Sequence, residues 1–157
     1  IMNQKILYKI AALCSRAERS EQYVKEKLST WNVSPEESSE IIDYLIKNKY
    51  LDNLRFACAF ARSKSLHSKW GQTKIAYHLR AKQVSSEHIS IALKQIDNET
   101  EDKILFDLLN KKAKTIKYKD LYDLKNKLLR FGISRGFSFS AINETIEKLQ
   151  KNASFTF

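Results

Sequence analysis

The chain has 157 residues, of which 43% are hydrophobic and 29% are charged, so it has room for one domain or a few small repeated units. Only three glycines and one proline occur, which argues against turn-rich β-sandwiches and barrels and points to an all-α fold. The formal net charge of +10 indicates a polyanionic partner, such as nucleic acid, an anionic membrane or an acidic protein surface.

A repeat with a period of about fifty residues runs along the chain. The matching segments are residues 24–34, 75–85 and 124–134, and in each an aliphatic residue lies four positions before a leucine. A β-branched residue followed by serine lies five positions after that leucine. In the third copy the match resumes at Ile142, after a short insertion around Gly136. Three copies of one unit therefore fill the chain.

Each repeat is predicted to contain three helices of about 10–15 residues, because its apolar residues recur at steps of three and four positions. We expect repeats at residues 1–51, 52–97 and 98–157, arranged as an elongated, curved array of helix-turn-helix-like units. Residues 34–37 (Ser-Pro-Glu-Glu) have the pattern of a helix start, with a capping serine followed by proline and acidic side chains. Residues 98–101 (Asn-Glu-Thr-Glu) predict a similar start. Weaker capping candidates are Ser20, Ser85 and Asp120.

The aromatic residues are predicted to serve mainly in packing. Phe56 and Phe60 are spaced four apart on the expected core side of a helix, and Phe106 lies among leucines. Trp70 stands beside Gly71 and between basic residues, which leaves two interpretations: packing between helices, which we favour, or stacking on a base or a partner. The phenylalanines near the C-terminus are expected to close the last core or to mark a contact site. They are Phe137, Phe139, Phe155 and Phe157.

Basic residues are distributed unevenly, and the three repeats carry net charges of +1, +5 and +4. No acidic residue occurs among the 34 residues between Asp52 and Glu87. On a helix predicted near 72–83, a stripe of basic side chains is expected at four-residue spacing. An acid-free stretch of this length favours an anionic partner over a merely solvated surface. The predicted contact residues are Arg55, Arg62, Lys64, Lys69, Lys74, His78, Arg80, Lys82, Lys111, Lys112, Lys114, Lys117, Lys119 and Lys125.

The sequence offers no recognisable catalytic motif. It has no glycine-rich phosphate loop, no HExxH, no GxSxG and no cysteine and histidine set with zinc spacing. Cys14 and Cys58 are predicted to be reduced, partly buried thiols. We therefore predict no enzyme activity, no cofactor and no metal. With no run of 18 apolar residues and no signal peptide, we expect a cytoplasmic protein that does not enter the membrane. The first residue is Ile rather than Met, so a leading segment is expected to be missing.

The second repeat resembles the RecX family. Residues 50–63 (YLDNLRFACAFARS) are similar to the family signature LdD-x-x-FA-x-x-fv-x-s, and residues 70–82 to the segment kG-x-x-kI-x-x-eL-x-x-kG that follows it. Upstream, residues 15–28 are similar to R-x-hS-x-x-El-x-x-kL, so the resemblance covers most of residues 4–97 and continues more weakly beyond. Gln83 departs from the pattern, because it replaces a glycine at a turn where a positive φ is expected.

This resemblance implies a regulator of the RecA recombinase that has no enzyme activity of its own. Proteins of this family bind the RecA–DNA filament along its groove and suppress strand exchange, ATP hydrolysis and coprotease activity, within DNA repair and the SOS response. We expect a monomer whose basic residues also bind single- and double-stranded DNA in a non-specific, salt-sensitive way. Two alternatives stay open at this point: a stand-alone helix-turn-helix module that binds duplex DNA, and a pure protein-interaction scaffold.

Overall fold

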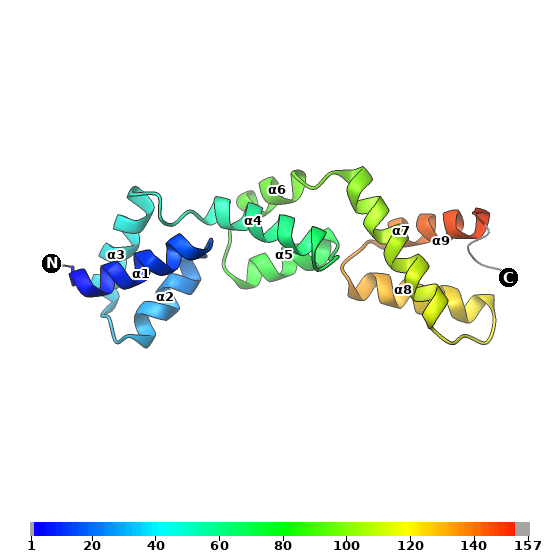
Figure 1. Cartoon of the computed structure of the whole chain (residues 1–157), viewed down its shortest axis with the longest axis horizontal. Helices are drawn as coiled ribbons and strands as arrows, with labels where there is room; N and C mark the ends of the chain where they lie inside the picture. The colour runs from blue at the N-terminus through cyan, green and yellow to red at the C-terminus, as the bar shows by residue number, and fades with distance from the viewer. Residues whose placement is uncertain (1, 153–157) are drawn as a thin grey trace. The chain divides into compact units, whose positions relative to one another are not determined.

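The computed structural model describes residues 2–152, and the regular structure in this range is entirely α-helical (Figure 1). Its helices follow one another in three sets of three, which confirms the prediction of an all-α fold built from tandem three-helix repeats. The repeat boundaries and the curved arrangement stay predictions. The helices are α1 (Gln4–Arg16), α2 (Glu21–Thr30), α3 (Pro35–Lys47), α4 (Asn53–Leu66), α5 (Gln72–Ala81), α6 (Ser86–Lys94), α7 (Asn98–Thr115), α8 (Leu121–Ser134) and α9 (Phe139–Lys151).

Contacts divide the chain into two compact units. The first compact unit contains the chain up to Phe60 together with Leu79–Ala92. The second compact unit contains Ala61–His78 and the chain from Leu93 onward. The helices of the middle repeat, α4 to α6, therefore contribute residues to both compact units.

Polar side chains cap the helices as predicted, with one exception. The Ser20, Ser34 and Asp120 side chains accept hydrogen bonds from backbone N–H groups three residues on, at 3.0, 3.2 and 2.8 Å. Such bonds satisfy donors that have no partner inside the helix. The prediction for α7 was wrong by one residue, because the capping position is Asp97 and its carboxylate accepts from the Thr100 hydroxyl instead of a backbone N–H.

The second helix of each repeat ends in the same turn. A backbone N–H donates to the carbonyl five residues back, and the residue before that donor has a positive φ. Gln83 is one of these residues, with φ of 61°, so the glutamine adopts the left-handed conformation that glycine would favour. The other two are Asn32 (φ 60°) and Gly136 (φ 96°). The three hydrogen bonds join Val33 N to Leu28 O, Val84 N to Leu79 O and Phe137 N to Gly132 O, at 3.0, 3.1 and 3.1 Å.

This shared turn corrects the predicted register of the third repeat. Phe137-Ser138, and not Ile133-Ser134, is the counterpart of the valine and serine that follow the turn in the other two copies. The inserted residues lie inside α8, which has 14 residues where α2 and α5 have 10. Four extra residues add about one helical turn, so the inward face is preserved while the end of the helix moves. Accordingly Phe137 is buried, whereas Ile133 is 51% exposed.

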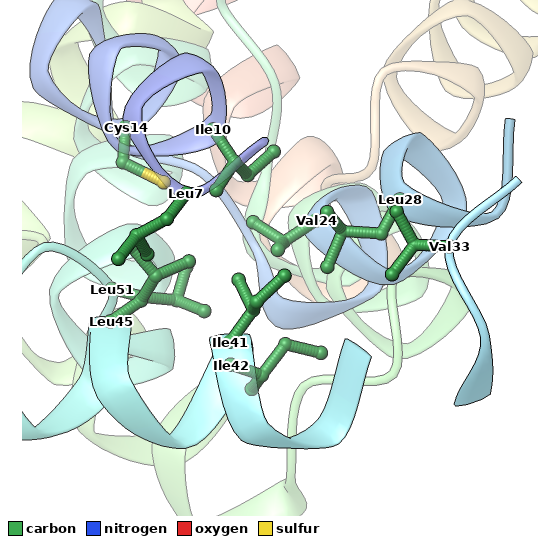
Figure 2. Packing of buried hydrophobic residues seen from close by; sticks show 10 residues of the cluster. All are labelled: Leu7, Ile10, Cys14, Val24, Leu28, Val33, Ile41, Ile42, Leu45 and Leu51. Carbon is green, nitrogen blue, oxygen red and sulfur yellow. The ribbon is translucent and has the colours of Figure 1, made fainter. Parts of the chain in front are cut away.

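The first and third repeats each enclose an apolar core. In the first, side chains from α1, α2 and α3 meet in a cluster that includes the fully buried Ile10, Leu28 and Ile41 (Figure 2). In the third, α7, α8 and α9 contact one another around Leu109 and Leu128. Burying such side chains is the main favourable term in folding of a helical repeat, since helices of 9 to 18 residues are marginal alone.

The aromatic predictions have mixed outcomes. Phe56 and Phe60 are only half-buried and contact each other with ring centroids 5.8 Å apart. The buried stripe of α4 instead contains Ala57 and Ala61, one residue later at the same spacing, so the phenylalanines are rotated away from the core. Phe106 packs half-buried against the core of the third repeat. Phe137 is in that core, Phe139 is 61% exposed, and Phe155 and Phe157 lie outside the described residues.

Within the second compact unit, the start of α5 is joined to the end of α8 through backbone atoms. The Gly71 N–H donates to the Arg135 carbonyl at 2.7 Å, and the Thr73 N–H donates to the Gly136 carbonyl at 3.1 Å. A Cβ on Gly71 would lie 2.3 Å from the Gly136 carbonyl oxygen, so only glycine permits this approach. The contact places the positive end of one helix dipole against the negative end of another. We call it the Gly71–Gly136 joint.

A partly buried carboxyl group lies beside the Gly71–Gly136 joint. Glu101 of α7 hydrogen-bonds the side chain of Gln72, the first residue of α5. Burial raises the pKa of Glu101 above its usual value, and this hydrogen bond only partly opposes the shift.

Candidate basic interface

The structure gathers most of the predicted contact residues in the second compact unit. Three of the fourteen, Arg55, Arg80 and Lys82, belong to the first compact unit. The eleven in the second are Arg62, Lys64, Lys69, Lys74, His78, Lys111, Lys112, Lys114, Lys117, Lys119 and Lys125.

Trp70 organises one group of these side chains, which we call the Trp70 cluster. The Nζ atoms of Lys64 and Lys74 lie 4.8 and 4.6 Å from the centroids of the Trp70 ring system, and the His78 ring lies 4.6 Å away. Lys74 Nζ also donates to the Ser134 carbonyl at 3.4 Å. A cation over an indole face is attracted by the electron density of the ring. Trp70 thus packs against side chains of its own chain, in agreement with the favoured interpretation.

The predicted stripe on α5 is confirmed only in part. Lys74 and His78 lie on one face, since both contact Trp70. Lys82 lies beyond the end of α5 at Ala81, and its ammonium is 5.8 Å from the Phe60 ring centroid in the first compact unit. The left-handed turn at Gln83 ends the helix too early for a third member of the stripe.

A second group of cations surrounds a cleft of about 390 Å³ on α7, which we call the α7 cleft. Ile104, Leu108 and Phe131 supply apolar surface, and Asp107 is the single acidic residue of the lining. The basic residues of the lining are Lys69, Lys111, Lys112 and Arg135. The Lys112 ammonium lies 4.8 Å from the Phe131 ring centroid and the Arg135 guanidinium 5.2 Å from it.

Lysines also follow the connection from α7 to α8. The Lys119 N–H donates to the Asp123 carboxylate at 3.0 Å, and the Lys127 ammonium lies 3.1 Å from the same oxygen. The backbone hydrogen bond from Lys119 and then the bond from Lys127 hold the pKa of Asp123 below its usual value. Asp123 thus stays charged and fixes this connection. The exposed lysines of the region are Lys111, Lys114, Lys117, Lys119 and Lys125.

In the first compact unit, Arg55 has a structural partner. Its Nε lies 2.6 Å from the Glu18 carboxylate, and this hydrogen bond raises the pKa of Arg55. The guanidinium also donates to the carbonyls of Lys49 and Tyr50 at 3.1 and 3.4 Å. Most of the charge of Arg55 is therefore balanced within the chain, whereas the side chain of Arg80 is exposed.

Phe131 and Arg135 are members of the α7 cleft that the sequence analysis did not single out. Their signal was present as a four-residue spacing, which brings an aromatic ring on α8 close to a cation at the C-cap of that helix. The spacing alone does not show that α7 lies opposite, and only the packing of α8 on α7 makes them part of a cleft.

Residues 2–152 contain no group of three or more His, Cys, Asp or Glu side chains that is suited to hold a metal ion. Cys14 is buried, and burial raises the pKa of its thiol, which keeps it protonated and unreactive at neutral pH. No helix in this range has the length and apolar character needed to cross a membrane.

Comparison with known proteins gives consistent matches. Residues 52–93 match the family description "RecX, second three-helix domain" and residues 99–146 match "RecX, third three-helix domain". The "Regulatory protein RecX" of Clostridium botulinum (strain Eklund 17B / Type B) is 30% identical over 132 residues, which are 83% of this chain and 61% of that protein. The protein of the same name from Clostridium perfringens (strain SM101 / Type A) is 29% identical over 136 residues, or 85% and 63%. The chain spans about three fifths of the length of these curated relatives.

Solved structures support the fold. A structure described as "Crystal structure of RecX from Lactobacillus salivarius" has a TM-score of 0.85 and 22% identity, over 94% of this chain and 96% of that chain. Two domains of one family match in order, on stretches that together make up more than half of the residues. Curated relatives also align along most of the length of this chain. The chain therefore belongs to the RecX family of regulatory proteins.

Proposed function

We propose that this chain binds the RecA–DNA filament and inhibits the recombinase, ATPase and coprotease activities of RecA, as a regulator without catalytic activity in DNA repair and the SOS response. Membership of the RecX family supports a regulatory role. The observation that carries the proposal is the gathering of eleven predicted contact residues in one compact unit. We propose further that the chain acts as a cytoplasmic monomer and needs no cofactor.

The chemistry of these side chains suits a phosphate backbone. Lysine ammonium groups bind phosphates as point charges and release counterions, which gives affinity without base sequence preference. Lys111, Lys114 and Lys117 are exposed, so their ammonium groups are accessible to such a backbone. Binding to single- and double-stranded DNA should therefore weaken steeply as the salt concentration rises.

The first test is DNA-dependent ATP hydrolysis by RecA on single-stranded DNA, with the chain titrated in at two salt concentrations. We expect inhibition well below one molecule per RecA monomer, and weaker inhibition at the higher salt concentration. Absence of inhibition at every ratio would contradict the proposal. If binding to naked duplex DNA with a clear sequence preference accompanied that absence, the helix-turn-helix alternative would replace it.

A pair of charge reversals tests the lysines themselves. Lys114→Glu with Lys117→Glu should weaken inhibition and lower the salt slope of single-stranded DNA binding by about 1.4, which is roughly 0.7 for each lost phosphate contact. The matched control is Lys25→Glu with Lys47→Glu, since these exposed lysines belong to the first compact unit and change the net charge equally. Equal losses in the two double variants would show that only the overall charge matters and would remove these lysines from the interface.

A further inference from the structure

The α7 cleft combines an apolar interior with a basic rim, and only the basic rim is required to bind a phosphate backbone. Its walls are mainly apolar, through Ile104, Leu108 and Phe131, while its rim is basic. An apolar surface contributes to affinity only when it is covered by another apolar group. The volume of about 390 Å³ lies at the lower end of the range for pockets that enclose a small ligand, so it accommodates one large side chain.

The cations on the rim are available to an anionic ligand. Within residues 2–152, Lys111, Lys112 and Arg135 form no ion pair with a carboxylate, Asp107 of the same lining included. Lys69 is partly engaged, because its ammonium donates to the Leu66 carbonyl at 2.7 Å. The rim is therefore a positive field around an apolar floor, with a single negative charge.

The geometry around Phe131 argues against a nucleobase as the occupant. Lys112 and Arg135 both lie over the ring, at 4.8 and 5.2 Å from its centroid. A base that stacks on this ring would have to displace a cation, whereas an apolar side chain can pack on Ile104 and Leu108 instead and a carboxylate would meet the same cations directly. The arrangement thus favours a ligand with acidic groups on either side of one apolar group.

We propose that the α7 cleft binds a short acidic segment of a partner protein, with one large apolar side chain in the cleft and carboxylates against Lys111, Lys112 and Arg135. This goes beyond the proposed function, because it assigns to a protein ligand some of the cations that would otherwise contact DNA. The joint supports the site, since the Arg135 carbonyl accepts from Gly71 and thereby fixes the backbone at one wall.

The test is fluorescence anisotropy with the full chain and a labelled seven-residue peptide, which has phenylalanine between two runs of three acidic residues. We expect saturable binding, about fivefold weaker binding when alanine replaces the phenylalanine, and about tenfold weaker binding by Lys112→Glu with Arg135→Glu. The control is Lys148→Glu with Lys151→Glu, two exposed residues of α9 outside the cleft, which should change the affinity less than twofold. Far-UV circular dichroism checks folding, and Lys112→Gln with Arg135→Gln replaces the cleft variant if that variant unfolds.

Three results would overturn the proposal: equal affinity for the two peptides, equal losses in the cleft and control variants, or a cleft variant that loses affinity for a single-stranded oligonucleotide but not for the peptide. The last result would make the cleft a nucleic-acid site. None of these measurements uses RecA, so the outcome is independent of whether the chain inhibits the filament.

Discussion

Gly71→Ala is the substitution whose effect the structure defines best. The new Cβ would lie 2.3 Å from the Gly136 carbonyl oxygen and 2.7 Å from the Phe137 nitrogen, and both are backbone atoms that cannot turn aside. The start of α5 must therefore move away from the end of α8. That movement breaks the bonds that Gly71 and Thr73 donate across the joint, at 2.7 and 3.1 Å.

The expected cost follows from these contacts. Two backbone hydrogen bonds contribute about 1 kcal/mol each, and poorer packing beside the buried Phe137 adds about 1 to 2 kcal/mol. We expect a loss of about 3–4 kcal/mol, which for a chain of this size lowers the melting temperature by about 6–16 °C. Thermal unfolding, followed by circular dichroism at 222 nm, measures the change in the melting temperature of the whole chain. Hydrogen exchange of the Thr73 amide reports local opening of the joint.

Thr73→Ala is the matched control, because this side chain is exposed and the alanine keeps the backbone donor. We expect it to change stability by less than about 0.5 kcal/mol. The reasoning would be refuted if Gly71→Ala had the same melting temperature as the original chain and its Thr73 amide were equally protected from hydrogen exchange. The Gly71–Gly136 joint would then not hold α5 against α8.

Three further predictions concern other residues, and one of them has a matched control substitution. Gln83→Gly should raise the free energy of unfolding in urea by about 0.5–1 kcal/mol, because a φ of 61° strains glutamine but not glycine. The control, Ala81→Gly at the end of α5, should lower the free energy of unfolding. A lower free energy of unfolding in Gln83→Gly would show that Gln83 is not strained. Glu101→Gln tests the pH dependence of stability. The pKa of Glu101 is raised in the folded chain, so the folded chain binds this proton more tightly than the unfolded chain does. The contribution of Glu101 to stability is therefore greatest below its pKa in the unfolded chain and is lost as the pH rises through its pKa in the folded chain. Urea midpoints measured from pH 4 to 8 should fall less in Glu101→Gln than in the original chain. Parallel curves would show that the Glu101 carboxyl does not contribute to the pH dependence of stability. Arg55→Gln should lower stability by about 1 kcal/mol through loss of its pairing with Glu18, yet leave affinity for single-stranded DNA unchanged; weaker DNA binding would restore Arg55 to the interface.

The sequence determined the helical class, the threefold repetition and most helix starts. These features depend on short-range physics: apolar residues at three- and four-residue steps form a buried stripe, and a side chain such as Ser34 caps the helix that follows it. The basic composition of the second and third repeats is likewise a property of the sequence alone. The family pattern has a glycine at position 83, but only the structure shows that Gln83 adopts a positive φ there.

Only the tertiary structure decided where the third repeat resumes and which cations lie together. An added helical turn in α8 leaves the apolar face intact, so periodicity does not show that Phe137 replaces Ile133 as the buried residue. Similarly, the sequence does not show which cations have a carboxylate partner. Arg55 pairs with Glu18, whereas Arg135 lines the α7 cleft. Pairings of this kind join residues far apart in the chain, and their energies depend on distance and burial, which composition does not determine.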